Sequence, residues 1–565
     1  MMKTVIIGGV AGGATAAARL RRLDEKMEII LLEKSGYISY ANCGLPYYIG
    51  GAITEKENLT LQTPQGFWNR FRIEARVRNE AAEIDPEKKT VRVRRLDDGS
   101  EYEESYDRLI LSPGARAVRP QIPGSDDPRI HTLRTVEDTD RIHDFLKSRP
   151  VRRAAVIGGG FIGLEAAENL MRLGIPVTLF QMEDQVLPPL DYDMACQVHA
   201  GLLENGLDLR LKSAVSHFVP TPEGVEAHTV RGGSVRADFV LMAIGVIPDT
   251  ALARSAGIEL GERGSIAVND RMETNLPDIY AVGDAVAVRN WITGEPSSVP
   301  LAGPANKQGR IAADQICGID SRYQGAQGST ILKLFDMTAA STGLNERAAR
   351  AAGMDYDRAV TYSTSHASYY PGAENMTVKT LFEKKSGRIL GAQIVGFDGV
   401  DKRIDVLSAA IRAGMTAQDL TELELAYAPP YSSAKDPVNM AGYVIENIRS
   451  GLVRQYHWQE VEALRTDSGA QLLDVRTPVE FQEGHIPGAL NIPLDELRDR
   501  LGELDRGRTF YVNCFSGLRS YIACRILTQN GLDCRNLAGG YRFYSCVMRD
   551  REWDPAPTHP CGIKI

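Results

Sequence analysis

The chain has 565 residues, which is too long for one hydrophobic core, so three or four domains are expected. Its formal net charge of −8 gives no reason to expect a nucleic acid or an anionic membrane as a partner, and no apolar run reaches membrane-spanning length. The eight cysteines are irregularly spaced, without a Cys-x2-Cys pair or a histidine cluster, so neither a disulfide framework nor a metal site is expected. The expected compartment is therefore the cytoplasm.

Two segments, about 150 residues apart, share one pattern: an apolar strand, a glycine turn and a helix rich in alanine and leucine. The second segment meets the full G-x-G-x-x-G spacing, whereas Val10 takes the middle position of the first. The fitting glycines are Gly8, Gly13, Gly158, Gly160 and Gly163. Glycine lets backbone N–H groups approach a pyrophosphate, and the helix N-terminus adds partial positive charge. Two such strand-to-helix junctions predict two dinucleotide-binding sites.

Each dinucleotide site needs a polar residue about twenty positions further on for the ribose hydroxyls. The strand expected over 28–32 ends at Glu33, and the strand expected over 177–180 ends at Gln181. Glu183 and Asp184 follow Gln181, and two acids would repel the 2′-phosphate of NADPH. The second site is therefore expected to prefer NADH, with NADPH the weaker cofactor.

The rest of the chain divides by its turns. Glycine turns close strands near 111–114 and 243–248, and residues 274–285 form a turn, a strand and a turn. Residues 326–448 alternate strands and helices without a phosphate loop, and 449–457 is typical of a linker. The predicted class is α/β, with domains at 1–112 plus 270–325, 113–269, 326–448 and 458–565.

The segment from Gly8 to Asp284 resembles the flavoprotein disulfide reductases that carry two dinucleotide sites. The resemblance implies FAD on the first site, a nicotinamide on the second, and Asp284 on the ribityl chain of FAD. Within that family, SYANCGLPY at 39–47 and AYAPPYSSAKDP at 426–437 resemble coenzyme A disulfide reductase. The resemblance covers about residues 1–450. It implies two Rossmann-like domains, for FAD and for the nicotinamide, followed by an α+β dimerisation domain.

The last domain resembles rhodanese along nearly its whole length. The similarity rests on LDVR at 473–476, GHIPGALNIP at 484–493 and CFSGLRS at 514–520. The loop after Cys514 would place backbone N–H groups around the sulfur, which favours a thiolate and hence a persulfide. Arg519 in that loop is expected to contact substrate. The pairing of domains resembles the coenzyme A disulfide reductase–rhodanese fusions, or NADH-dependent persulfide reductases.

Two catalytic cysteines are expected: Cys43 in the reductase part and Cys514 in the rhodanese domain. The next cysteine after Cys43 is Cys196, so no Cys-x4-Cys pair can close beside the flavin. A lone thiolate there must form its redox disulfide with an external thiol, a persulfide or a peroxide. Cys561, near the C-terminus, is expected to be a surface thiol.

No C-terminal His–Glu acid–base pair of the glutathione reductase type lies near residue 440. Tyr369 and Tyr427 are therefore the predicted acid–base or sulfur-positioning groups, and Tyr427 is also placed at the cofactor. Tyr370 and Tyr431 are close rivals that the sequence does not separate. The resemblance also implies a coenzyme A channel along the first helix, with Lys435 reaching it from a second subunit. The expected coenzyme A contacts are Thr15, Arg19, Arg22, Ser39, Asn42, Asn306 and Lys435.

These features together predict a homodimeric FAD enzyme that uses NADH to reduce coenzyme A persulfide, polysulfide or coenzyme A disulfide through Cys43. The rhodanese domain would handle sulfane sulfur. Three alternatives stay open. The protein could be a plain coenzyme A disulfide reductase with an independent sulfurtransferase domain, or an NADH oxidase or peroxidase using a Cys43 sulfenate. The third alternative is a non-enzymatic sensor or carrier of sulfane sulfur.

Overall fold

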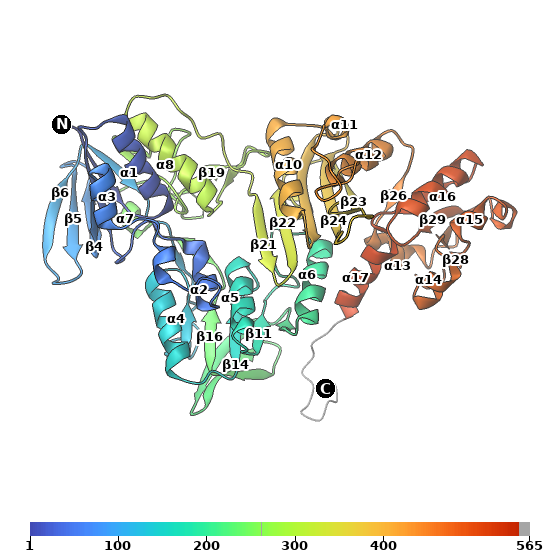
Figure 1. The fold of residues 1–565 in the computed structure, drawn as a ribbon, viewed down its shortest axis with the longest axis horizontal. Helices are drawn as coiled ribbons and strands as arrows, with labels where there is room; N and C mark the ends of the chain where they lie inside the picture. Colours follow the sequence, from blue (N-terminus) through green and yellow to red (C-terminus); the bar gives the residue numbers. More distant parts are fainter. Residues whose placement is uncertain (262, 553–565) are drawn as a thin grey trace. The chain divides into compact units, whose positions relative to one another are not determined.

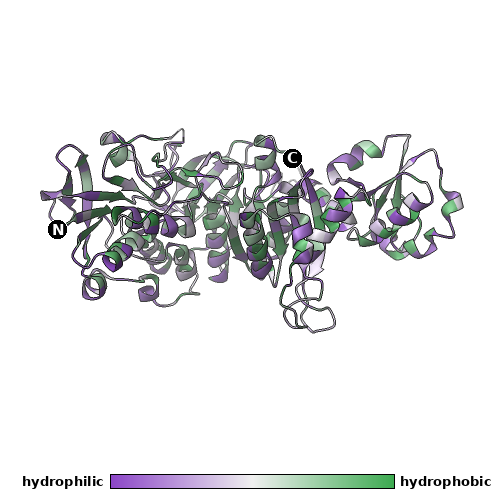
Figure 2. Cartoon of the chain, turned by 90° about the horizontal axis from the view of Figure 1, so that it is seen from above, coloured by the Kyte–Doolittle hydropathy of each residue, from purple (hydrophilic) through white to green (hydrophobic). Residues whose placement is uncertain are grey.

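The computed structural model describes residues 1–261 and 263–552, and its contacts divide the chain into two compact units (Figure 1). The first unit comprises residues 1–183 and 207–326. The second comprises residues 184–206 and the chain from Gln327 onward. None of the helices within the two described ranges is long and apolar enough to cross a membrane. Hydrophobic residues are concentrated on the strands, whereas most helices carry both hydrophilic and hydrophobic positions (Figure 2).

The first unit contains two five-stranded parallel sheets whose three central strands are arranged alike. In each sheet the strand that precedes the glycine turn lies at the centre, and its neighbours come later in the chain. One sheet consists of β18 (Ile279–Ala281), β7 (Arg108–Leu111), β1 (Lys3–Ile7), β2 (Glu28–Glu33) and β3 (Glu74–Val77), in this order. The other consists of β12 (Asp208–Arg210), β11 (Val177–Phe180), β10 (Ala154–Ile157), β16 (Phe239–Met242) and β9 (Ile130–Thr132). The prediction of two Rossmann-like halves is confirmed.

Helices follow each glycine turn, and smaller antiparallel sheets flank the two halves. Helix α1 (Ala11–Leu23) packs against α8 (Ala302–Ile316), and α5 (Phe161–Arg172) follows the second turn. The strands of the three-stranded sheets are β4 (Asn79–Asp85), β5 (Thr90–Arg95) and β6 (Glu101–Ser105), and β13 (Val215–Thr221), β14 (Gly224–Thr229) and β15 (Ser234–Ala237). Strands β8 (Ala115–Ala117) and β17 (Val246–Pro248) form an antiparallel pair.

The second unit begins its main sheet at residue 330. Five antiparallel strands lie in the order β21 (Thr330–Leu334), β22 (Met337–Gly343), β25 (Ile389–Gly396), β24 (Asn375–Glu383) and β23 (Tyr356–Thr364). Helices α10 (Val400–Ala413) and α12 (Pro437–Arg449) pack against this sheet. The strands thus form one sheet before the main helices follow, rather than alternating with them as the sequence suggested, and the α+β domain that the resemblance implies is confirmed.

The C-terminal part of the second unit is a parallel sheet with helices, as predicted for the rhodanese domain. Its strands are β26 (Gln455–Tyr456), β30 (Cys534–Leu537), β29 (Thr509–Asn513), β27 (Ala470–Asp474) and β28 (Leu490–Asn491). Its main helices are α14 (Pro478–Glu483), α16 (Leu518–Gln529) and α17 (Gly540–Glu552). Because β26 pairs with β30, residues 455–456 of the expected linker belong to this sheet.

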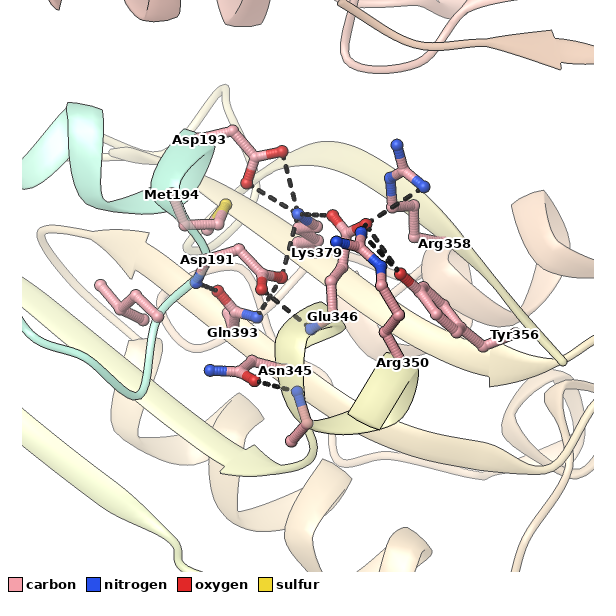
Figure 3. Close-up of polar contacts among 12 residues, drawn as sticks. Asp191, Asp193, Met194, Asn345, Glu346, Arg350, Tyr356, Arg358, Lys379 and Gln393 are labelled. Carbon is pink, nitrogen blue, oxygen red and sulfur yellow. Dashed lines mark hydrogen bonds and ion pairs between the residues drawn. The ribbon is translucent and has the colours of Figure 1, made fainter. Parts of the chain in front are cut away.

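Helix α6 (Tyr192–Glu204) lies inside the expected nucleotide-binding segment 113–269, yet it packs on β22 and β25 of the second unit. A buried charge explains this placement (Figure 3). The Lys379 ammonium on β24 contacts Asp193 of α6 at 2.7 Å, Asp191 at 3.0 Å and Glu346 at 2.6 Å. Burial alone would lower the pKa of Lys379, but these three carboxylates outweigh it and raise that pKa. A buried ammonium needs such partners, so residues 184–206 stay with the sheet that carries Lys379.

Polar contacts also hold α17 of the rhodanese domain on α6. His199 accepts the backbone N–H of Val186 on Nε2 (3.1 Å), so its Nδ1–H donates to Asp550 (2.7 Å). The Tyr192 hydroxyl donates to the other Asp550 oxygen at 2.7 Å. Burial alone would raise the pKa of Asp550, but the bonds from His199 and Tyr192 lower it. Trp458, at the start of the rhodanese domain, donates its indole N–H to Asp193 (3.2 Å).

Candidate active site

In the first glycine turn, backbone packs closely on backbone in front of α1. A β-carbon on Gly13 would lie 1.9 Å from the Gly8 carbonyl oxygen, and Gly8 has φ +98, so only glycine fits both positions. Glu33, at the end of β2, accepts the backbone N–H groups of Gly9 and Ser35, each at 2.8 Å. Burial raises the pKa of Glu33 against these two bonds. The turn and this carboxylate fit the pyrophosphate and ribose of a dinucleotide.

The second glycine turn repeats this arrangement. A β-carbon on Gly163 would lie 2.0 Å from the Gly158 carbonyl oxygen, while Gly160 faces open space. Gln181 at the end of β11 accepts the Gly159 N–H at 3.0 Å, as Glu33 accepts that of Gly9. The two predicted ribose-binding residues therefore occupy equivalent positions, one charged and one neutral.

Cys43 lies on a short 3-10 turn (Asn42–Gly44) that leads into α2 (Leu45–Ile49). Its side chain is exposed, and α2 packs against α5, the helix that follows the second glycine turn, and against α4 (Val136–Ser148). The other cysteine of residues 1–183 and 207–326 is Cys317, directly after α8. The thiol that the sequence singles out is thus accessible and has no neighbouring cysteine on its own turn.

Arg134, which the sequence analysis missed, joins the Cys43 turn to the predicted flavin-binding aspartate. Its guanidinium donates to Asp284 at 2.7 Å. In the amide orientation that satisfies both groups, the Asn42 side chain donates to the Arg134 carbonyl at 2.7 Å and accepts from its guanidinium. Arg134 comes just after β9, far from both partners in sequence, and no motif marks it.

Glu165 on α5 is a second residue that the motifs did not identify. The Tyr47 hydroxyl donates to Glu165 at 3.2 Å. Burial raises the pKa of Glu165 to about 7, against the opposing effect of the Tyr47 bond. Partial desolvation of the sulfur by the surrounding residues, and then the negative charge of Glu165, raise the pKa of the exposed Cys43 thiol, whereas Arg134 lowers it. A carboxyl that titrates near neutrality therefore lies within electrostatic range of Cys43.

The expected coenzyme A contacts are only partly brought together. Thr15 donates to Asn306 at 2.8 Å, so these two predicted residues are neighbours. Arg19 forms an ion pair with Asp314 at 2.7 Å, so its guanidinium already has a partner within the protein. Arg22 is exposed on the same helix. Ser39 has φ +46, and its backbone N–H donates to Gly9 at 2.8 Å.

In the second unit, the hydroxyls of Tyr369 and Tyr427 lie 3.0 Å apart, and both rings are exposed. The rival Tyr370 packs edge-on against His366, and Tyr431 is 72% exposed. Lys435 is also exposed. The pair Tyr369–Tyr427 is thus the one in which two predicted hydroxyls meet.

Arg403 holds both tyrosine loops, and it is fully buried. Its guanidinium donates to the Ser365 carbonyl at 2.8 Å, to the Ser432 hydroxyl at 3.0 Å and to Asp436 at 3.1 Å. Ser365 begins the loop of Tyr369, and Ser432 follows Tyr427. One buried cation therefore fixes the two segments relative to each other.

The Cys514 loop has the expected geometry of a sulfur cradle. The Gly517 N–H lies 3.1 Å from Cys514 Sγ and the Ser520 hydroxyl 3.3 Å from it, at the start of α16. Gly517 has φ +99, which a residue with a side chain rarely adopts. Arg519 forms a double hydrogen bond to Glu480 (2.6 and 2.8 Å), which lowers the pKa of that carboxyl to about 2. Cys561 lies outside the described residues.

Comparison with known proteins agrees with this arrangement. Residues 2–309 match the pyridine nucleotide-disulphide oxidoreductase family, 330–437 match its dimerisation domain, and 457–545 match the rhodanese-like domain. The chain is 38% identical to coenzyme A disulfide reductase of Staphylococcus aureus (strain JH9) over 444 residues, which is 78% of this chain and 99% of the relative.

Two solved structures are similar to nearly the whole chain. Reduced CoADR-RHD of Bacillus anthracis superposes with a TM-score of 0.95 at 46% identity, covering 97% of this chain and 98% of that one. The NAD-dependent persulfide reductase of A. fulgidus superposes with a TM-score of 0.90 at 39% identity, covering 96% and 100%. The predicted oxidoreductase that uses FAD and NADH is confirmed. This protein belongs to the pyridine nucleotide-disulphide oxidoreductase family.

Proposed function

We propose that the protein uses NADH to reduce coenzyme A persulfide, polysulfide or coenzyme A disulfide at Cys43, while Cys514 handles sulfane sulfur. The observation that carries this proposal is the pair of distinct sulfur sites in one chain. Cys43 is an exposed lone thiol in the unit with both dinucleotide turns, and Cys514 lies in a cradle of hydrogen-bond donors. The relatives named above, which act on coenzyme A disulfide and persulfide, support it.

The chemistry at Cys43 follows from thiol–disulfide exchange. The Cys43 thiolate attacks the coenzyme A sulfur of a disulfide or persulfide, forming a mixed disulfide and releasing coenzyme A or HS⁻. FAD, which the first glycine turn and Glu33 would hold, would supply two electrons from NADH, and these would return Cys43 to the thiolate and release coenzyme A. Arg134 favours the thiolate, and Glu165 can take up or deliver a proton near neutral pH.

Thr15 and Asn306 are proposed to contact coenzyme A, together with Ser39 and Asn42 near the reacting sulfur. Arg22 is a stronger candidate for its phosphates than Arg19, because Asp314 already pairs with Arg19. Tyr369 and Tyr427 are proposed as the sulfur-positioning hydroxyls, and Lys435 as a contact from a second subunit. The match to the dimerisation domain supports a homodimer.

The test is NADH consumption by the purified protein with coenzyme A disulfide, coenzyme A persulfide, polysulfide and hydrogen peroxide. The proposal expects turnover with the sulfur substrates and a loss of about a thousandfold or more in Cys43→Ser. Cys317→Ser is the matched control and should keep the activity. Turnover with peroxide alone would favour an NADH peroxidase, and a single stoichiometric oxidation of NADH would favour a sulfur carrier or sensor.

A further inference from the structure

Two thiols of the rhodanese domain lie against each other, apart from Cys514. Cys524 is on α16, and Cys534 is the first residue of β30. The Cys534 thiol donates to the Cys524 backbone carbonyl at 3.4 Å, so the two cysteines contact each other. Both are buried in one apolar cluster, with 2% and 6% exposure. A single buried cysteine acts as a small hydrophobe, but two neighbouring thiols can also be oxidised together to a disulfide.

One face of α16 runs from the Cys514 loop to this pair. Ser520, Cys524 and Thr528 follow one another at four-residue intervals, so they lie along the same side of the helix. At one end, Ser520 contacts Cys514 Sγ, and at the other the Thr528 hydroxyl lies 3.3 Å from Cys534 Sγ.

The pair is nevertheless a separate site. Cys534 pairs in register with Phe510 near the start of β29, whereas Cys514 follows the end of that strand. Four residues of strand span about 13 Å, which is too far for a disulfide between Cys534 and Cys514. Cys534 therefore has Cys524, and not Cys514, as its neighbouring thiol.

The two thiols differ in acidity. Hydrogen bonds from Cys524 and Thr528 lower the pKa of the Cys534 thiol, although burial opposes them. The bond to Cys534, and then burial, raise the pKa of Cys524. The sequence neighbour Asp533 and the contacting Thr528 are both exposed, so Cys534 lies just beneath the surface. Because Cys534 lies nearer the surface than Cys524, it is the nucleophile of the pair, and Cys524 is the resolving thiol.

We propose that Cys524 and Cys534 form a redox-active dithiol that sulfane sulfur oxidises to a disulfide. The Cys534 thiolate takes one sulfur atom from a polysulfide, which is left one atom shorter. Cys524, as it loses its proton, attacks the Cys534 sulfur, and HS⁻ leaves. Two thiols and one sulfane sulfur atom thus give one disulfide and one molecule of hydrogen sulfide, and two electrons pass to the sulfur atom. The supply of sulfane sulfur rests on the proposed function.

Peptide mapping of the reduced full-length protein tests this proposal. The protein is incubated with sodium tetrasulfide, desalted, unfolded in iodoacetamide and digested with trypsin. Cleavage after arginine separates residues 520–525 and 526–535, each with one cysteine of the pair, from 509–519 with Cys514. The expected product is the linked peptide 520–525/526–535, which disappears with dithiothreitol. It should form equally in Cys514→Ser and be absent from Cys534→Ala.

Recovery of both peptides as alkylated free thiols from wild-type protein would overturn the proposal, and this result does not depend on any variant folding. A diamide-treated sample provides a second arm. A disulfide that forms with diamide but not with tetrasulfide would contradict sulfane sulfur as the oxidant. NADH-dependent reduction of coenzyme A disulfide, assayed on the same preparation, reports the proposed function separately.

Discussion

The preference between the two nicotinamide cofactors depends on Gln181. Its amide accepts the Gly159 N–H, and the following Glu183 is exposed. Wild-type protein should have a higher kcat/KM with NADH than with NADPH, since Glu183 after β11 would repel a 2′-phosphate and the nearby Arg210 is already paired with Asp208. Gln181→Arg should lower the ratio of kcat/KM with NADH to kcat/KM with NADPH by about tenfold, which corresponds to roughly 1.4 kcal/mol.

Arg210 tests the reasoning behind that prediction. Its backbone carbonyl accepts the Gln181 N–H, and its guanidinium pairs with Asp208 at 3.1 Å. If wild-type protein used NADPH as well as NADH, and Arg210→Met abolished the NADPH activity alone, Arg210 would be the phosphate contact. Steady-state kinetics with both cofactors distinguish the two outcomes.

Glu165 should set the pH at which Cys43 becomes reactive. Its carboxylate raises the pKa of the Cys43 thiol, so Glu165→Gln should shift Cys43 ionisation to lower pH. The measurement is the rate of alkylation of Cys43 by iodoacetamide as a function of pH. Arg134→Met should shift the same profile to higher pH, since Arg134 lowers that pKa. A shift of both variants in one direction would contradict the electrostatic explanation.

The raised pKa of Glu165 also predicts the direction in which the unfolding free energy changes with pH. Burial brings the pKa to about 7 in the folded protein, above the ordinary carboxyl value. The native state therefore binds the Glu165 proton more tightly than the unfolded state does. The contribution of this proton to the unfolding free energy is complete at acid pH and is lost as pH rises through about 7. Unfolding free energies of wild type should fall more steeply between pH 5 and 8, on the order of 1–3 kcal/mol, than those of Glu165→Gln.

At the scale of elements, Lys379 decides where α6 belongs. Lys379→Met would leave Asp191, Asp193 and Glu346 buried without their shared cation, at a cost of about 3–5 kcal/mol in unfolding free energy. Lys384→Met is the control, because that exposed lysine pairs only with exposed Asp355, and its loss should cost less than about 1 kcal/mol. Equal, small losses in urea unfolding would show that the buried cluster adds no specific stability.

The sequence predicts elements well where one local pattern specifies them. The two glycine turns and the strand ends at Glu33 and Gln181 were found because strand, turn and helix follow each other directly. The placement of α6 could not be found in this way, since its partner Lys379 lies far along the chain. Arg134 and Glu165 were missed for the same reason. Arg134 gains its role from contacts with Asn42 and Asp284, and Glu165 from its contact with Tyr47 on α2, and only the folded chain creates these contacts.

For the whole molecule, the central question is whether the two sulfur sites work in one cycle. Cys514→Ser should spare reduction of coenzyme A disulfide and lower persulfide-dependent NADH oxidation by about tenfold or more, if sulfur must first load on Cys514. The measured quantity is the ratio of the two activities in wild type and variant. An unchanged ratio would mean that the rhodanese domain acts independently, which is the plain coenzyme A disulfide reductase alternative.

The contact of His199 and Tyr192 with Asp550 has a consequence for the order of events during synthesis. Helix α6 leaves the ribosome long before α17, so the buried His199 imidazole and the partly buried Tyr192 hydroxyl gain their Asp550 partner only when the last helix has been made. The contact between α6 and α17 therefore forms last. A chain that ends within the rhodanese sequence would leave these polar atoms of α6 without their Asp550 partner. Chaperones and proteases act on such incompletely folded chains.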